Sequence, residues 1–160
     1  MNVTLDYFED LIEQEVRDGT PRHRIVFFGF SQGGSIVTLF LQTRRIAAEL
    51  PAVISFSGFP ATALQTIVRM QKEQGLVERW SKNTKMFLLH GAQDAFVSDR
   101  LYRAWKKQLE GFAAKGQGIA SIEGRVVEGV RHSIRDTVWI PTREILELVV
   151  PYEEQRPLKL

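Results

Sequence analysis

The chain has 160 residues, of which 44% are hydrophobic and 25% are charged, a composition typical of a globular protein with a single core. Its net charge of +2 comes from Lys and Arg interspersed with Asp and Glu, so no dense basic stripe supports nucleic-acid binding. The absence of cysteine excludes disulfides, thiol catalysis and Cys-ligated metal, and we expect a cytoplasmic protein.

The first predicted element is an amphipathic helix over residues 3–17, with acidic side chains between its apolar positions. Those acidic residues argue against a signal peptide, and no apolar run in the chain approaches the ~20 residues of a transmembrane segment. The turn sequence 18–21 ends the helix. An apolar run then predicts the first strand at Arg24–Phe28.

Between this strand and a long helical pattern from Ile36 to Leu50 lies Gly29–Gly34, with the letters GFSQGG. A G-x-S-x-G sequence between a strand and a helix is typical of a nucleophile elbow, in which a strained serine projects its hydroxyl from the sheet. We expect glycine at Gly29 and Gly33 because a Cβ there would collide with the neighbouring strand and helix. The backbone amide of Gln32 then faces the position of an oxyanion. A plain glycine-rich turn is the alternative.

In the rest of the chain, predicted strands continue to alternate with predicted helices. Further strands are predicted at Ala52–Phe56, Met86–Leu89 and about Arg125–Glu128. A helix opening near Ser98 is expected to bury one apolar face, made of Leu101, Trp105, Leu109 and Phe112. A last helix ends near Val150 and is started or kinked by Pro141. The polar segment Ala61–Lys85 is expected to form a surface helix, with a cap over the site as the alternative.

Short apolar strands alternating with helices predict an α/β fold, with a mostly parallel sheet and helices on both faces. We expect one domain over residues 1–150 and a loosely attached tail over 151–160. Chemistry in such sheets gathers in loops at the carboxyl ends of the strands, where Ser31, Asp94 and His132 fall. Their order along the chain, serine, acid and histidine, is the order of the α/β-hydrolase triad.

Each candidate also has a structural alternative. Asp94 suits a turn after a strand. Asp99 and Asp136 are rival acids, but both positions suit the first turn of a helix better. His90 is expected to cap a strand and His23 to be solvated. No group of His, Asp and Glu has metal-ligand spacing, so we expect no metal.

A family resemblance strengthens the triad interpretation. Four ordered segments resemble the phospholipase/carboxylesterase family, which includes the acyl-protein thioesterases: GFSQGG at 29–34, SGFP at 57–60, HGAQDAFV at 90–97 and EGVRHS at 128–133. The resemblance implies that Ser31 is the nucleophile, Asp94 the acid and His132 the general base, with the Gln32 amide as one oxyanion donor. It also implies acyl ester or thioester substrates, such as lipidated proteins, lysophospholipids or small esters, and no cofactor.

The chain also departs from the family pattern. Family members begin with two or three more strands and a His-Gly-rich loop that supplies a second oxyanion amide, so we expect an N-terminally truncated domain with low turnover on its own. The first strand would then be an open apolar edge carrying Phe27 and Phe28, which favours self-association. The alternative function is a catalytically impaired hydrolase-like fragment or a non-catalytic interaction protein.

Overall fold

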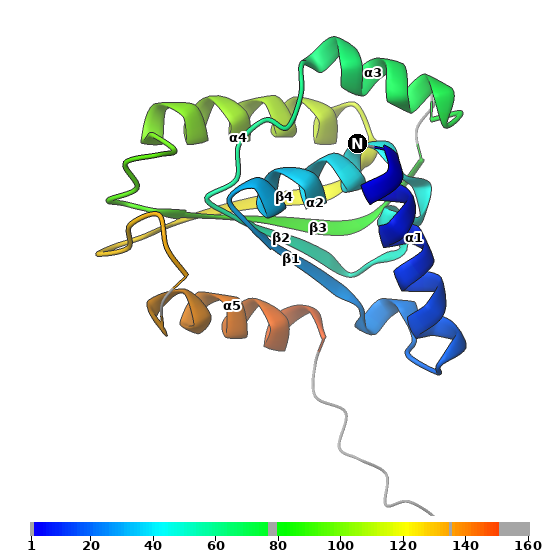
Figure 1. Cartoon of the computed structure of the whole chain (residues 1–160), viewed down its shortest axis with the longest axis horizontal. Coiled ribbons are helices and arrows are strands. Elements are labelled where there is room, and N and C mark those ends of the chain that lie inside the picture. Colours follow the sequence, from blue (N-terminus) through cyan, green and yellow to red (C-terminus); the bar gives the residue numbers. More distant parts are fainter. Residues whose placement is uncertain (1, 77–79, 135, 151–160) are drawn as a thin grey trace, which may run out of the picture.

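A single parallel sheet forms the centre of the molecule. The computed structural model describes residues 2–76, 80–134 and 136–150. The strands lie in the order β1-β2-β3-β4, and each pairs in parallel with the next (Figure 1). Their bounds are Val26–Phe30 (β1), Ala52–Phe56 (β2), Trp80–Gly91 (β3) and Gln117–Val127 (β4). The predicted parallel sheet is confirmed.

Helices cover both faces of this sheet, as predicted (Figure 1). On one side lie α1 (Asn2–Arg17), α2 (Gln32–Thr43), α3 (Leu64–Glu73) and α4 (Asp99–Ala114). On the other side lies α5 (Asp136–Val149), which contains Pro141 in its interior rather than at its start. None of the helices in the described ranges has both the length and the hydropathy of a membrane span.

Several boundaries differ from those predicted. The first strand begins at Val26, because Arg22–Arg24 form a short 3-10 helix before it. The helix expected from Ile36 to Leu50 begins earlier, at Gln32, and ends at Thr43, where Arg44 adopts an extended conformation. A separate 3-10 helix follows at Arg45–Glu49. The apolar pattern continues across this break, so periodicity alone did not reveal it.

The apolar face of α4 differs from the prediction at one position. Trp105, Leu109 and Phe112 are buried as expected, but Leu101 is 39% exposed and Tyr102 is buried instead. The Tyr102 hydroxyl donates a hydrogen bond of 3.2 Å to the carbonyl of Leu88 in β3. A tyrosine can therefore take the inward position, because its polar end has a partner.

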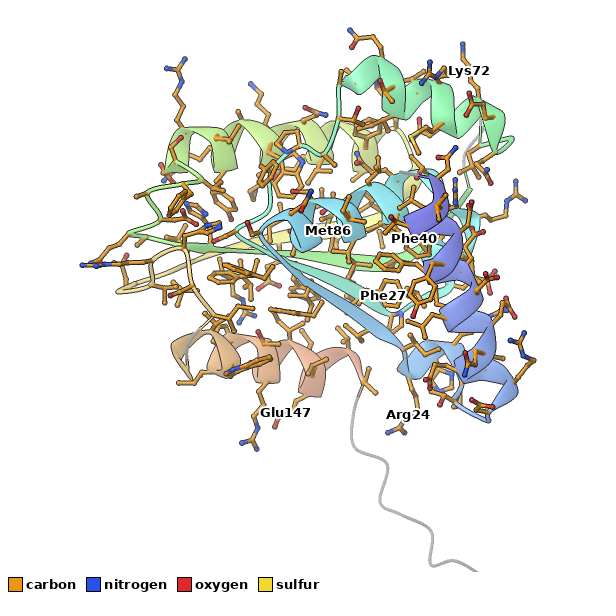
Figure 2. All side chains as sticks on the ribbon, viewed as in Figure 1. Arg24, Phe27, Phe40, Lys72, Met86 and Glu147 are labelled. Atoms are coloured by element: carbon orange, nitrogen blue, oxygen red, sulfur yellow. The ribbon has the colours of Figure 1, made fainter. Side chains whose placement is uncertain are left out.

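The core between the sheet and the four helices is built on aromatic contacts near β1. Phe27 and Phe40 point toward one another in Figure 2, and their ring centroids are 5.4 Å apart. Phe8 of α1 meets both rings edge-on, at 5.1 Å and 5.6 Å. A buried Arg44 at the end of α2 pairs with Asp6 of α1 at 2.7 Å. These contacts hold α1 beside β1 and α2.

A second core lies between the sheet and α5. It contains Ile54, Phe56 and Phe87 from the strands and Ile145 from α5. At its margin, Phe28 of β1 stacks on Trp139 with ring centroids 5.8 Å apart. Both faces of β1 are thus covered, while the side of β1 away from β2 has no paired strand in the described part of the chain.

The segment Ala61–Lys85 contains α3, which packs beside α2. Ile67 and Met70 belong to the same core cluster as the buried residues of α2. The Gln71 side-chain amide donates a hydrogen bond of 2.9 Å to the carbonyl of Gln42, near the far end of α2 from Ser31. These contacts support the surface-helix prediction over the cap. Residues 77–79 of this segment and the predicted tail at 151–160 lie outside the described residues, and the single-domain division stays a prediction.

Candidate active site

The site is built at the carboxyl ends of the parallel strands. Phe30 of β1 pairs with Phe56 of β2, and Ser31 follows directly. The Ser31 amide donates a hydrogen bond of 2.9 Å to the carbonyl of Phe56, and α2 begins at the next residue. Ser31 adopts φ 54° and ψ −120°, a strained conformation for a residue with a side chain. This is the strand–turn–helix geometry predicted for an elbow.

The two glycines predicted to be required for space behave differently. A Cβ on Gly29 would lie 2.3 Å from the carbonyl oxygen of Gly33, so only glycine fits there. A Cβ on Gly33 would have no neighbour within 4 Å, so the predicted collision at Gly33 is wrong. The close approach occurs one residue later, where a Cβ on Gly34 would lie 2.6 Å from the Ser55 hydroxyl. The helix turns Gly34 toward β2 and leaves Gly33 facing open space.

Asp94 is fixed in the turn that follows β3. Its amide donates a hydrogen bond of 3.0 Å to the carbonyl of Gly91, the last residue of β3. Its Oδ1 accepts hydrogen bonds of 2.9 Å from the amides of both Phe96 and Val97. Burial raises the pKa of Asp94, but the Ser57 hydroxyl, these two amides and His132 together hold it below its ordinary value of 3.8. The carboxyl group is therefore ionised at neutral pH.

His132 lies in the loop after β4 and joins the other two side chains. Its Nδ1 is 2.8 Å from Oδ2 of Asp94, and its Nε2 is 2.8 Å from Oγ of Ser31. Since an ionised carboxylate can only accept, Nδ1 carries a proton, and Nε2 accepts from the Ser31 hydroxyl. The imidazole is flanked by the rings of Phe30 and Phe96, with centroids 4.9 Å and 5.1 Å away.

The structure therefore brings Ser31, Asp94 and His132 together, although they are up to 101 residues apart in the chain. Such a chain of contacts lets the serine lose its proton to the imidazole while the carboxylate stabilises the resulting imidazolium. Gln32 opens α2, so its amide is one of the helix N-terminal donors with no partner inside the helix. Those donors and the helix dipole favour negative charge beside Ser31.

The rival residues lie elsewhere. Asp99 is in the first turn of α4 and pairs with Arg103 at 2.6 Å. Asp136 is the first residue of α5, the helix start that was expected. His23 is exposed, in a 3-10 helix rather than a loop. No group of three metal-ligating side chains is found in the described ranges.

His90 differs from its predicted role as a strand cap. It lies within β3, is 2% exposed, and stacks on Tyr102 with ring centroids 4.6 Å apart and an angle of 7° between the planes. Its Nδ1 is buried without a hydrogen-bond partner. Desolvation lowers the pKa of His90 from its ordinary value of 6.5, so the ring is neutral at neutral pH. His90 therefore contributes to the packing of β3 against Tyr102 of α4.

Ser57, at the end of β2, was not singled out from the sequence as a site residue. It is 1% exposed, has φ 48°, and donates its amide to the carbonyl of Leu89 at 2.8 Å. The signal that could have revealed it is the segment SGFP at 57–60. This segment carried part of the family resemblance, but no role was assigned to its serine. The next residue, Gly58, is held against Trp105, since a Cβ there would lie 2.9 Å from that ring.

Comparison with known proteins identifies the family of the chain. The sequence profile described as Phospholipase/Carboxylesterase matches residues 1–147. The chain is 33% identical to acyl-protein thioesterase 1 of Neurospora crassa over 95 residues, which make up 59% of this chain and 36% of that protein. It is 37% identical to acyl-protein thioesterase 1 of Cryptococcus neoformans over 98 residues, or 61% of this chain and 37% of that protein. The matched segment thus spans about a third of the length of these curated relatives.

Solved structures show the same architecture. The crystal structure of Arabidopsis thaliana SOBER1 superposes with a TM-score of 0.65 at 18% identity, covering 90% of this chain and 61% of that one. Esterase PE8 superposes with a TM-score of 0.61 at 20% identity, covering 93% of this chain and 60% of that one. At these identities the likeness concerns the fold alone, which is that of an α/β-hydrolase.

Proposed function

Since the chain belongs to the phospholipase/carboxylesterase family, we propose that it is a serine hydrolase that cleaves carboxylic ester or thioester bonds. The observation that carries the proposal is the continuous contact from Ser31 through His132 to Asp94, with both bridging distances at 2.8 Å. Distances of this size are those of a nucleophile, a base and an orienting acid ready for proton transfer.

In the proposed reaction, Ser31 Oγ attacks the carbonyl carbon of the acyl group while His132 Nε2 takes the hydroxyl proton. Asp94 holds Nδ1–H and stabilises the imidazolium. The imidazolium then protonates the departing alcohol or thiol, which leaves an acyl group on Ser31. Water, deprotonated by the same imidazole, attacks this acyl-enzyme and releases the carboxylic acid. The serine regains its proton, and no cofactor takes part.

The tetrahedral intermediate carries a negative oxygen that needs hydrogen-bond donors. The Gln32 amide at the start of α2 is the donor proposed in this chain, and the helix N-terminus adds favourable dipole. The strained conformation of Ser31 supports this role, since it sets the hydroxyl beside the first amides of the helix.

The proposed substrates are acyl groups on an alcohol or thiol, in lipidated proteins, lysophospholipids or small esters. The relatives' name, acyl-protein thioesterase, supports the thioester member of this class. The apolar rings of Phe30 and Phe96 beside His132 suit an acyl chain better than a charged group. A cytoplasmic location stays a prediction.

A fluorophosphonate probe tests the proposal, because it reacts with a serine that a neighbouring base activates. We expect the protein to be labelled at Ser31 and the Ser31→Ala variant not to be labelled. Ser35→Ala is the matched control, since Ser35 lies four residues on in α2 and its hydroxyl already bonds the Ser31 carbonyl at 3.3 Å. Equal labelling of the parent and Ser31→Ala would rule out Ser31 as the nucleophile, and no labelling of either would favour the non-catalytic alternative.

A further inference from the structure

Ser57 shares an unusual backbone conformation with Ser31. In the described part of the chain, these two are the residues other than glycine with positive φ, at 48° and 54°. They occupy adjacent positions on neighbouring strands, because each follows one member of the Phe30–Phe56 pair. Glycine adopts positive φ without strain, so the strain at Ser57 points to a use for its side chain.

The Ser57 hydroxyl is buried and lacks a hydrogen bond of ordinary length and angle. A buried hydroxyl without a partner is costly, so such a group calls for an explanation. Ser57 Oγ is nevertheless close enough to Asp94 to lower the pKa of that carboxyl, ahead of Val97, His132 and Phe96. The backbone places both residues at the same end of β3, since the Ser57 amide bonds the Leu89 carbonyl at 2.8 Å and the Asp94 amide bonds the Gly91 carbonyl at 3.0 Å.

The Asp94 carboxylate has room for one more donor. Its side chain is 0% exposed, so bulk solvent does not reach it. Oδ1 accepts from the amides of Phe96 and Val97, while Oδ2 accepts from His132 at 2.8 Å. A carboxylate has about four acceptor positions, so three described donors leave one position open.

We propose that Ser57 is a positioning residue, whose hydroxyl donates a hydrogen bond to the Asp94 carboxylate and holds it against His132. This inference rests on the proposed function for its catalytic consequence. When His132 takes the proton of Ser31, the charge on the Asp94–His132 pair is redistributed, and a donor on the carboxylate keeps that group ionised and oriented. The Ser57 proton stays on its own oxygen throughout.

The test is a ¹³C NMR titration of labelled aspartate carboxyl carbons, with the Asp94 signal assigned from Asp94→Asn. We expect Asp94 to titrate about 1 pH unit higher in Ser57→Ala than in the parent, the effect of losing one hydrogen bond to a charged group. Ser57→Gly should give the same shift. It also relieves the positive φ, so it keeps the test open if Ser57→Ala does not fold.

Ser55→Ala is the matched control. Ser55 is in the same strand, is 1% exposed and also has a hydroxyl without a partner, but that hydroxyl lies against Gly34 and Gly58. The titration of Asp94 should not move in this variant. An unchanged Asp94 titration in both Ser57 variants, or an equal shift in Ser55→Ala, would overturn the proposal.

Kinetics separate this inference from the proposed function. In an ester hydrolysis assay, Ser57→Ala should lower kcat about tenfold with KM unchanged, since the lost hydrogen bond acts on the triad and not on substrate binding. A rise in KM with kcat unchanged would contradict a positioning role. If a fluorophosphonate does not label Ser31 in the parent, the proposed function fails, while the Asp94 titration still decides the placement of Ser57.

Discussion

Ser31, Asp94 and His132 could be predicted because each follows a strand at the same edge of the sheet. The distances between them could not be predicted, since they depend on how β1, β3 and β4 are ordered in space. Ser57 was missed for a related reason. Its positive φ and its burial are properties of the folded chain, and nothing in the local sequence indicates them.

The assignment of the acid can be tested by removing each carboxylate in turn. We expect Asp94→Asn to lower kcat for ester hydrolysis by about 10⁴, because an amide in this place favours the wrong imidazole tautomer. Asp99→Asn should lower kcat only slightly, since Asp99 pairs with Arg103 in α4, whereas Nδ1 of His132 faces Asp94. A larger loss in Asp99→Asn than in Asp94→Asn would move the acid to Asp99.

His90 should make the stability of the protein fall in mild acid. Its folded pKa is lowered by burial, so the unfolded chain binds the proton more readily. The stability contributed by neutral His90 is present above pH 6.5, the unfolded value, and is lost as the pH falls below it. His90→Phe keeps a ring against Tyr102 and removes this titration.

Urea unfolding at pH 7 and pH 5 measures the effect. The free energy of unfolding should fall less between these pH values in His90→Phe than in the parent. His23→Phe is the control for replacing an imidazole by a phenyl ring, because His23 is exposed and lies outside the core. An equal fall in the parent and His90→Phe would show that His90 does not carry this dependence.

At the scale of the elements, apolar patterns gave the existence and order of helices and strands better than their ends. The pattern from Ile36 to Leu50 crosses the break at Arg44, because the 3-10 helix Arg45–Glu49 also buries apolar residues, although its backbone differs from that of α2. The inward face of α4 was misplaced because a hydropathy pattern ranks Leu101 above Tyr102. The Leu88 carbonyl, which satisfies the tyrosine hydroxyl, comes from β3 and cannot be seen in the local sequence.

The two elbow glycines should respond in opposite ways to alanine. A Cβ at Gly29 would meet backbone atoms of Gly33 and Gly34 at 2.3–2.7 Å, so Gly29→Ala should lower the free energy of unfolding by about 3 kcal/mol or more. Gly33→Ala meets nothing within 4 Å in a helix, and should raise it by about 0.5–1 kcal/mol.

Chemical denaturation of the two variants beside the parent checks this pair. Each variant differs from the parent by one added methyl group, and the two sites lie four residues apart. Each variant therefore serves as the control for the other. Equal destabilisation by the two substitutions would mean that α2 does not pack on β1 as described here.

At the scale of the whole molecule, the open side of β1 is the feature with the clearest physical consequence. In the described part of the chain β1 has no strand paired on its outer side, but its Phe27 and Phe28 are half-buried against Phe8 and Trp139. Trp139 itself is 51% exposed beside this edge. Unpaired backbone groups next to an exposed aromatic ring favour pairing with another strand.

We therefore expect this 160-residue chain to self-associate as its concentration rises, measured by sedimentation velocity. Trp139→Lys should weaken the association by placing a charge beside the edge. Leu148→Lys is the matched control, because Leu148 is 58% exposed on the same helix, more than two turns beyond Trp139. A parent that stays monomeric over the whole concentration range, or equal effects of both substitutions, would contradict edge pairing.

In the proposed reaction, Ser31 forms an acyl-enzyme with the help of His132 and Asp94. Rapid-quench mass spectrometry during p-nitrophenyl acetate hydrolysis detects this intermediate on its own residue. We expect one acetyl group to appear on the peptide containing Ser31 and then to decay, and we expect Ser31→Ala and His132→Ala to accumulate none on that peptide. Release of p-nitrophenol at the parent rate by Ser31→Ala, or acetylation confined to another residue, would contradict this mechanism.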